Sequence, residues 1–114
     1  MEAAIRQRLL EVLRTFPRAD LTAEYDPSLA DLLWWKGDRL MVAEVSIVID
    51  EHDVDRAFAR AETLRRAGID AFPAAIGNVW ASPEVQAHAA AHRLEWKVGD
   101  DLSDGFIAFR RLAG

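Results

Sequence analysis

One hairpin signal constrains the fold of this chain most strongly. Two segments rich in Trp, Val and Ile, residues 31–36 and 39–49, flank the dipeptide Gly37-Asp38. A two-residue loop containing glycine suits a type I′ or II′ turn, whose twist matches that of two antiparallel strands. The loop length also sets the register, because each residue then pairs with the one equally far from the turn on the other strand. Asp31 is therefore expected directly opposite Glu44.

The pairing of Asp31 with Glu44 predicts a site for a divalent metal ion. Their Cβ atoms would lie about 5 Å apart on one face of the sheet, and like charges so placed are destabilising unless a cation or a bound proton compensates them. Mg²⁺ and Mn²⁺ take oxygen ligands, commonly one or two carboxylates with waters and phosphates. An ion held here could activate a water for attack on a phosphodiester. The alternative is that the hairpin frays before Asp31 and both carboxylates point into water.

The other elements predict an α/β domain with a mixed sheet flanked by helices. Hydrophobic periodicity, caps and breakers favour six further elements, over residues 3–16 (helix), 21–26 (strand), 53–67 (helix), 69–77 (strand), 83 onward (helix) and 94–98 (strand). Residues 105–109 fit either a strand or a helix. The resulting order, α-β-β-β-α-β-α-β, combines a hairpin with a strand-helix-strand crossover, which gives a mixed sheet.

Length and composition narrow the classes of function. The 114 residues suit one domain over 1–114, and the absence of cysteine excludes disulfides and thiolate metal sites and suits a cytoplasmic protein. The first residues lack the apolar stretch of a signal or membrane segment, so no membrane partner is expected. A net charge of −5 opposes non-specific capture of nucleic acid. Any contact with nucleic acid must then use a local basic patch.

The order of elements and the motif around the acidic pair resemble the PD-(D/E)XK nuclease superfamily over residues 1–98. Asp31 followed by Glu44-Val45-Ser46 is similar to its core motif. The segment 43–61 is also similar to uncharacterised prokaryotic proteins, often with coiled coils, that carry a degenerate form of this domain. The resemblance implies a restriction-endonuclease-like fold, with Asp31, Glu44 and Ser46 at the catalytic positions. It also implies that Glu11 is a further metal ligand beside Asp31 and Glu44.

The chain departs from the superfamily at Ser46, where a lysine is expected. Loss of a charged group that stabilises the transition state costs on the order of 3 to 4 kcal/mol, or at least hundreds-fold in rate. Arg56 and Arg60 lie one helical turn apart and could contact a phosphate or Glu44. The alternative is that Arg56 pairs with acidic residues of its own helix, Asp53 or Asp55. Phosphodiesterase activity is therefore expected to be weak or absent.

Two histidines offer a separate metal signal. His88 and His92 are four residues apart, a spacing that can bind a metal on one helix face. No acidic residue accompanies them in a recognised zinc pattern, so packing along the helix is the favoured interpretation.

Three functions remain open from the sequence. The leading one is a nuclease-like domain with a degenerate Mg²⁺ or Mn²⁺ and phosphate site. The second is a protein-interaction or dimerisation module that uses Trp34, Trp35, Trp80 and unpaired sheet edges. The third is an active Mg²⁺-dependent nuclease in which an arginine replaces the missing lysine.

Overall fold

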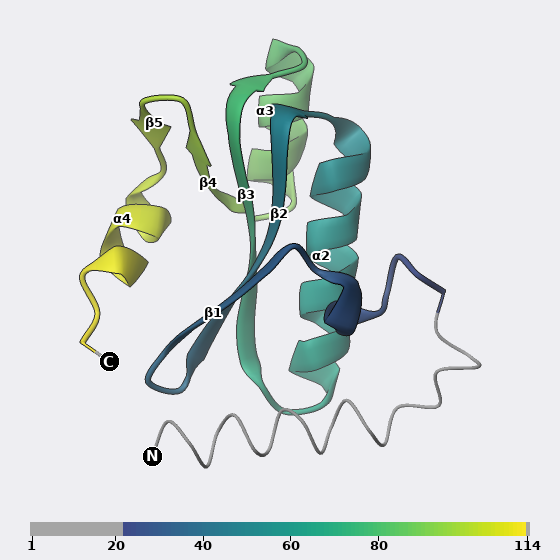
Figure 1. Cartoon of the computed structure of the whole chain (residues 1–114), viewed down its shortest axis with the longest axis vertical. Coiled ribbons are helices and arrows are strands. Elements are labelled where there is room, and N and C mark those ends of the chain that lie inside the picture. The colour runs from purple at the N-terminus through teal and green to yellow at the C-terminus, as the bar shows by residue number, and fades with distance from the viewer. Residues whose placement is uncertain (1–21, 114) are drawn as a thin grey trace.

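The computed structural model describes residues 22–113, which form a five-stranded mixed sheet with helices on both faces (Figure 1). The strands lie in the order β1-β2-β3-β4-β5, the same order as in the sequence. In chain order the elements are the 3-10 helix η2 (Pro27–Leu29), β1 (Leu32–Lys36), β2 (Arg39–Ile49), α2 (Glu51–Arg66), β3 (Asp70–Trp80), α3 (Pro83–Ala91), β4 (Glu95–Val98), β5 (Asp101–Leu102) and α4 (Asp104–Arg110).

The predicted hairpin and its register are confirmed. β1 and β2 are antiparallel and pair from Lys36 with Arg39 at the turn to Leu32 with Ala43 at the open end. Gly37 has a φ of 59°, and a positive φ at the first loop position alone is the pattern of a type II′ turn. The pairing of β2 with β1 stops at Ala43, and β2 continues for six more residues to Ile49. The second half of β2 therefore extends past its antiparallel partner.

A parallel crossover through α2 forms the centre of the sheet. Asp50 caps α2 in a reciprocal capping box with Asp53, which explains why the helix begins two residues before the predicted position. Gly68, with a φ of 86°, follows the helix in the left-handed conformation, as predicted. β3 then pairs in parallel with β2 over almost the full length of both strands. This long pairing carries β3 to Trp80, beyond the end predicted from composition.

The last third of the chain covers both faces of the sheet. Ser82 and Pro83 begin α3, as predicted, and β4 adds to the sheet parallel to β3. The ambiguous segment 105–109 belongs to α4, which buries Phe106 and Phe109 against the sheet. α2 and α3 pack on the opposite face, where their apolar side chains surround Ala75 and Ile49.

The four tryptophans contribute to the core. Trp35 is buried between β1 and α2. Trp34 is partly buried and stacks edge-on against Phe109 of α4. Trp80 and Trp96 are partly buried on the α3 face and form a second edge-on pair. The burial of Trp35 leaves it no surface for a partner.

The predicted strand over residues 21–26 is wrong for the part that the structure describes. Residues 23–25 form a turn, and the Asp26 side chain caps η2 by accepting a hydrogen bond from the backbone of Ser28. A six-residue alternation is a weak signal, and capping by Asp26 favours a turn here. The predicted helix over residues 3–16, with Glu11, lies outside the described residues. None of the described helices is both long enough and apolar enough to cross a lipid bilayer.

Candidate functional site

Glu44 is the centre of a buried network of charges between β2 and α2. Its side chain is almost fully buried, with the residue 2% exposed. Oε1 accepts from two guanidiniums, Nε of Arg56 at 3.1 Å and a terminal nitrogen of Arg60 at 2.7 Å. The predicted contact of both arginines with Glu44 is therefore present. A buried carboxylate requires such partners, because an unpaired charge in the interior is very costly.

The two arginines differ in their surroundings. Arg60 is 5% exposed and also donates to the backbone oxygen of Ala23, which ties the turn before η2 to α2. Its Nε has no hydrogen-bond partner within the described part of the chain. Arg56 is more open, with 35% of its side chain exposed, and donates to Asp53 at 2.7 Å as well as to Glu44. The alternative pairing of Arg56 with Asp53 thus coexists with its contact to Glu44.

Two pKa values in and beside this network are shifted in the direction that favours the charged form. Burial disfavours the charge of Arg56, but the hydrogen bonds and charges of Glu44 and Asp53 outweigh burial and raise its pKa. The backbone hydrogen bond from Asp53, in the capping box, lowers the pKa of Asp50. Both shifts keep these side chains charged at neutral pH.

Asp31 lies beside Glu44 at the open end of the hairpin, one residue outside β1. Its backbone N–H is 3.5 Å from Oε2 of Glu44, and its Oδ2 accepts from the backbone N–H of Val45 at 2.9 Å. The expectation that a frayed hairpin leaves both carboxylates in water is wrong for Glu44, which is buried. Asp31 is exposed, and its carboxylate is turned onto the backbone of β2.

Ser46 follows Glu44 on β2 at the position where the superfamily motif has lysine. Its hydroxyl donates to the backbone oxygen of Val48 at 3.0 Å, within its own strand. Because the hydroxyl is uncharged and already bonded to its own strand, Ser46 offers no positive charge that could stabilise a phosphate.

The donors and acceptors of the network define its chemistry. Arg56 bridges Glu44 and Asp53, Arg60 pairs with Glu44, and Asp31 contacts Glu44 through its backbone N–H. Glu44 Oε1 is held by both arginines and its Oε2 by the Asp31 N–H, so a divalent cation would have to displace contacts that Glu44 already makes. Two positive charges beside these oxygens weaken such binding, because each repels the ion. Glu11, the third predicted ligand, lies outside the described residues.

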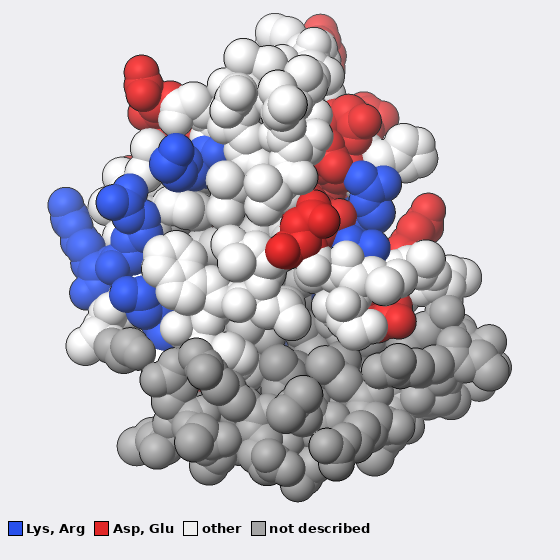
Figure 2. Space-filling model, viewed as in Figure 1, with Lys and Arg blue, Asp and Glu red and all other residues white. Residues whose placement is uncertain are grey.

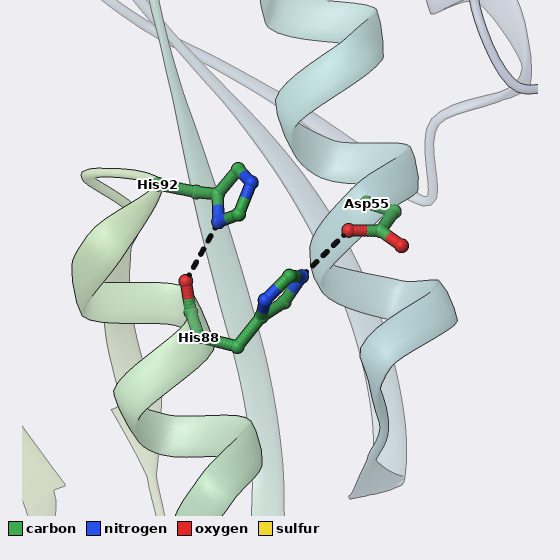
Figure 3. A group of neighbouring side chains, drawn as sticks. All are labelled: Asp55, His88 and His92. Carbon is green, nitrogen blue, oxygen red and sulfur yellow. Dashed lines mark hydrogen bonds and ion pairs between the residues drawn. The ribbon is translucent and has the colours of Figure 1, made fainter.

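A second group of possible metal ligands lies between α2 and α3 (Figure 3). Asp55 from α2 meets His88 and His92 from α3, and the three ligand atoms all lie within 4.8 Å of one another. Among the described residues, this is the group of three His, Cys, Asp or Glu side chains whose ligand atoms lie close enough together to hold a metal ion. The spacing of His88 and His92 was visible in the sequence, but Asp55 is more than thirty residues away. Only the packing of the two helices makes it a neighbour.

On the face in Figure 2, most basic side chains gather at the left, whereas the right carries most of the acidic side chains with some basic ones among them. Lys and Arg cluster around α4 and the hairpin turn, where Lys36 donates to the backbone oxygens of Arg110 and Leu112. Arg39, which pairs with Lys36 across the turn, lies over the ring of Phe72. This basic patch is separated by the hairpin from the Glu44 network at its other end.

Comparison of the chain with protein-family models, with curated proteins and with solved structures gives no match.

Proposed function

We propose that this chain is a nuclease-like domain with a restriction-endonuclease-like fold and a degenerate active position. Asp31, Glu44 and Ser46 occupy that position, which binds Mg²⁺ or Mn²⁺ weakly and hydrolyses phosphodiesters poorly or not at all. The observation that carries the proposal is the double ion pair on Glu44. In a working metal site this carboxylate would face the ion, whereas here Arg56 and Arg60 share its Oε1.

The surrounding contacts support the same conclusion. Ser46 donates to its own strand and brings no charge to the place where a phosphate would be held. Arg56 is the one guanidinium of the network with substantial exposure, and two carboxylates already engage it. A phosphate would therefore have to compete with Glu44 and Asp53 for the same donors. If nucleic acid binds, we place the contact at the basic patch around Lys36 and Arg110, because Coulomb attraction to phosphate is strongest there.

The test combines metal titration with a cleavage assay on the whole chain. Calorimetry with Mn²⁺ and Mg²⁺ should give weak binding that is lost in Asp31→Asn and in Glu44→Gln. Incubation with single- and double-stranded DNA and RNA in either ion should give no cleavage above a metal-free control. Metal-dependent cleavage that Asp31→Asn abolishes would instead establish an active nuclease. A wild type that binds neither ion would overturn the metal part of the proposal.

A second candidate, self-association, is favoured by an apolar surface at the carboxyl ends of β2 and β3. Four β-branched side chains are exposed there, Val45, Ile47, Val48 and Val79, with Ile47 at 74%. Val48 and Val79 pair in register, so their exposed side chains are neighbours, and adjacent exposed apolar side chains mark interaction surfaces more often than isolated ones do. The surface lies past the end of β1, and no described strand pairs with β2 on that side.

Sedimentation velocity over a range of protein concentrations tests this candidate. A dimer that forms through the surface should dissociate in Ile47→Lys, which places a charge at its centre. Leu29→Lys is the matched control, because Leu29 is also exposed but lies in η2. A wild type that stays monomeric at high concentration would exclude self-association.

A further inference from the structure

The group formed by Asp55, His88 and His92 has the composition of a transition-metal site. It lies between α2, which supplies Asp55, and α3, which supplies both histidines (Figure 3). The side chain of Asp55 is 58% exposed and that of His88 is 28% exposed, so an ion can reach them from solvent. His88 Nε2 and Asp55 Oδ1 are 2.8 Å apart and already form a hydrogen-bonded pair.

The orientation of His92 leaves one ring nitrogen for a metal. Its Nδ1 is 2.9 Å from the backbone oxygen of His88, and a ring nitrogen can bond to a carbonyl only by donating a proton. A neutral ring that donates through Nδ1 carries its lone pair on Nε2, which is the nitrogen on the side toward Asp55 (Figure 3). Metal-bound histidines are usually oriented by a hydrogen bond of this kind from the other nitrogen. Phe58 packs edge-on against the ring and further restricts it.

The spacing of the three ligands is compatible with one ion. In a tetrahedral zinc site, bonds of about 2.0 Å place the ligand atoms about 3.3 Å apart. The 2.8 Å pair of His88 with Asp55 is close to that value, and the whole group lies within 4.8 Å. Asp55 is exposed, so its side chain can turn toward an ion without leaving the core.

The ligand types select the class of metal. Two imidazoles and one carboxylate favour Zn²⁺, Co²⁺, Ni²⁺ or Cu²⁺, whereas Mg²⁺ and Ca²⁺ prefer all-oxygen sites. We propose that Asp55, His88 and His92 form a zinc-class metal site that links α2 to α3. Three protein ligands leave one coordination position open, as in catalytic rather than structural zinc sites.

A groove borders this open position. Its lining includes two of the ligands, Asp55 and His92, together with Arg66 and two further carboxylates, Glu24 and Glu62. Because these acidic side chains repel an anion, the fourth ligand of the ion is water. This site shares no residue with the Asp31 and Glu44 position and does not depend on the function proposed for it.

The test is titration of Zn²⁺ and Co²⁺ into the untagged whole chain. Calorimetry should give one Zn²⁺ per chain, and Co²⁺ should produce the visible absorption bands of a low-symmetry, histidine-ligated ion. Loss of an outer partner of a metal ligand already costs about 10- to 100-fold in affinity, so His92→Gln, His88→Gln and Asp55→Asn should each weaken Zn²⁺ binding at least about tenfold. Zn²⁺ should also raise the Tm of the wild type but not that of His92→Gln.

His52→Gln is the matched control, because His52 is exposed in the first turn of α2 and is the remaining histidine of the chain. It should bind Zn²⁺ as the wild type does. Glu44→Gln should also retain Zn²⁺ while losing Mn²⁺, which separates failure here from failure at the acidic pair. Circular dichroism of each variant shows whether it is folded. The proposal is overturned if the wild type binds no Zn²⁺ at a ratio of one, or if His52→Gln weakens binding as much as the three ligand variants do.

Discussion

Replacing Glu44 by glutamine should destabilise the protein by about 3 kcal/mol or more. The substitution keeps the shape of the side chain but removes its charge, which leaves Arg60 almost fully buried without a counter-ion. Removal of one partner from a buried ion pair typically costs about 3 to 5 kcal/mol, and we expect the lower end because the amide oxygen still accepts a hydrogen bond. Acidic metal positions behave in the opposite way. Neutralising one of two adjacent carboxylates in an ion-free site relieves repulsion and stabilises the fold.

Urea unfolding, monitored by tryptophan fluorescence, measures the free energy of unfolding of the wild type and of Glu44→Gln. Trp35 reports on this transition because it is buried in the core that α2 covers. Arg56→Gln should cost at most about 1 kcal/mol, because this arginine is 35% exposed and exposed ion pairs contribute little. The double variant Glu44→Leu with Arg60→Met should recover most of the lost stability, since apolar replacement of a buried pair is often neutral or favourable. A Glu44→Gln protein as stable as the wild type, or more stable, would refute the assignment of this carboxylate to the ion pairs.

Two further substitutions test the local structure. Asp50→Asn keeps a good N-cap for α2 but removes the charge. The pKa of Asp50 is lowered in the folded state, so the ionised carboxylate stabilises the fold. This contribution is present above about pH 4 and is lost as the pH falls through the folded pKa. The Tm of the variant should thus lie below that of the wild type at pH 6 and approach it as the pH falls through the folded pKa, and a difference that does not shrink on acidification would contradict the linkage. Gly77→Ala should destabilise by about 2 kcal/mol or more in urea unfolding, because a Cβ there would overlap the backbone oxygen of Ser46 on β2. Gly37→Ala is the comparison, because a Cβ there would meet nothing but the φ of 59° adds about 1 kcal/mol of strain, and a cost of Gly77→Ala no larger than this would exclude overlap as its cause.

Local signals predicted the parts of this fold that local chemistry determines. The Gly37-Asp38 turn determines the hairpin register, and that register alone places Asp31 beside Glu44. Caps such as Ser82 with Pro83 marked helix ends correctly, because they satisfy backbone groups within a few residues.

The errors and omissions depend on contacts between distant segments. The turn at residues 23–25 is held in part by Arg60, from a helix that follows much later, so a short alternation could not reveal it. The tail from residue 105 became helical because Phe106 and Phe109 could bury against an uncovered sheet face. Asp55 could not be assigned to His88, because their separation of 33 residues is bridged only when α2 and α3 pack on the same face. The helical spacing of Arg56 and Arg60 predicted their contact with Glu44, but the burial of Arg60 depends on the turn at residues 23–25 and did not follow from the sequence.

The hydrogen bond from Val45 to Asp31 affects how the free edge of β2 meets other chains. An unpaired strand edge is a template for aggregation, and proteins protect such edges with charged groups and with side chains that occupy the backbone donors. Asp31 does both, because its carboxylate accepts the Val45 N–H and places a negative charge where an added strand would begin to pair. Any association through Ile47 and its neighbours must therefore proceed by packing of side chains rather than by extension of the sheet from that point. The same residue that resembles a nuclease ligand thus occupies a backbone donor on the stretch of β2 that no described strand covers.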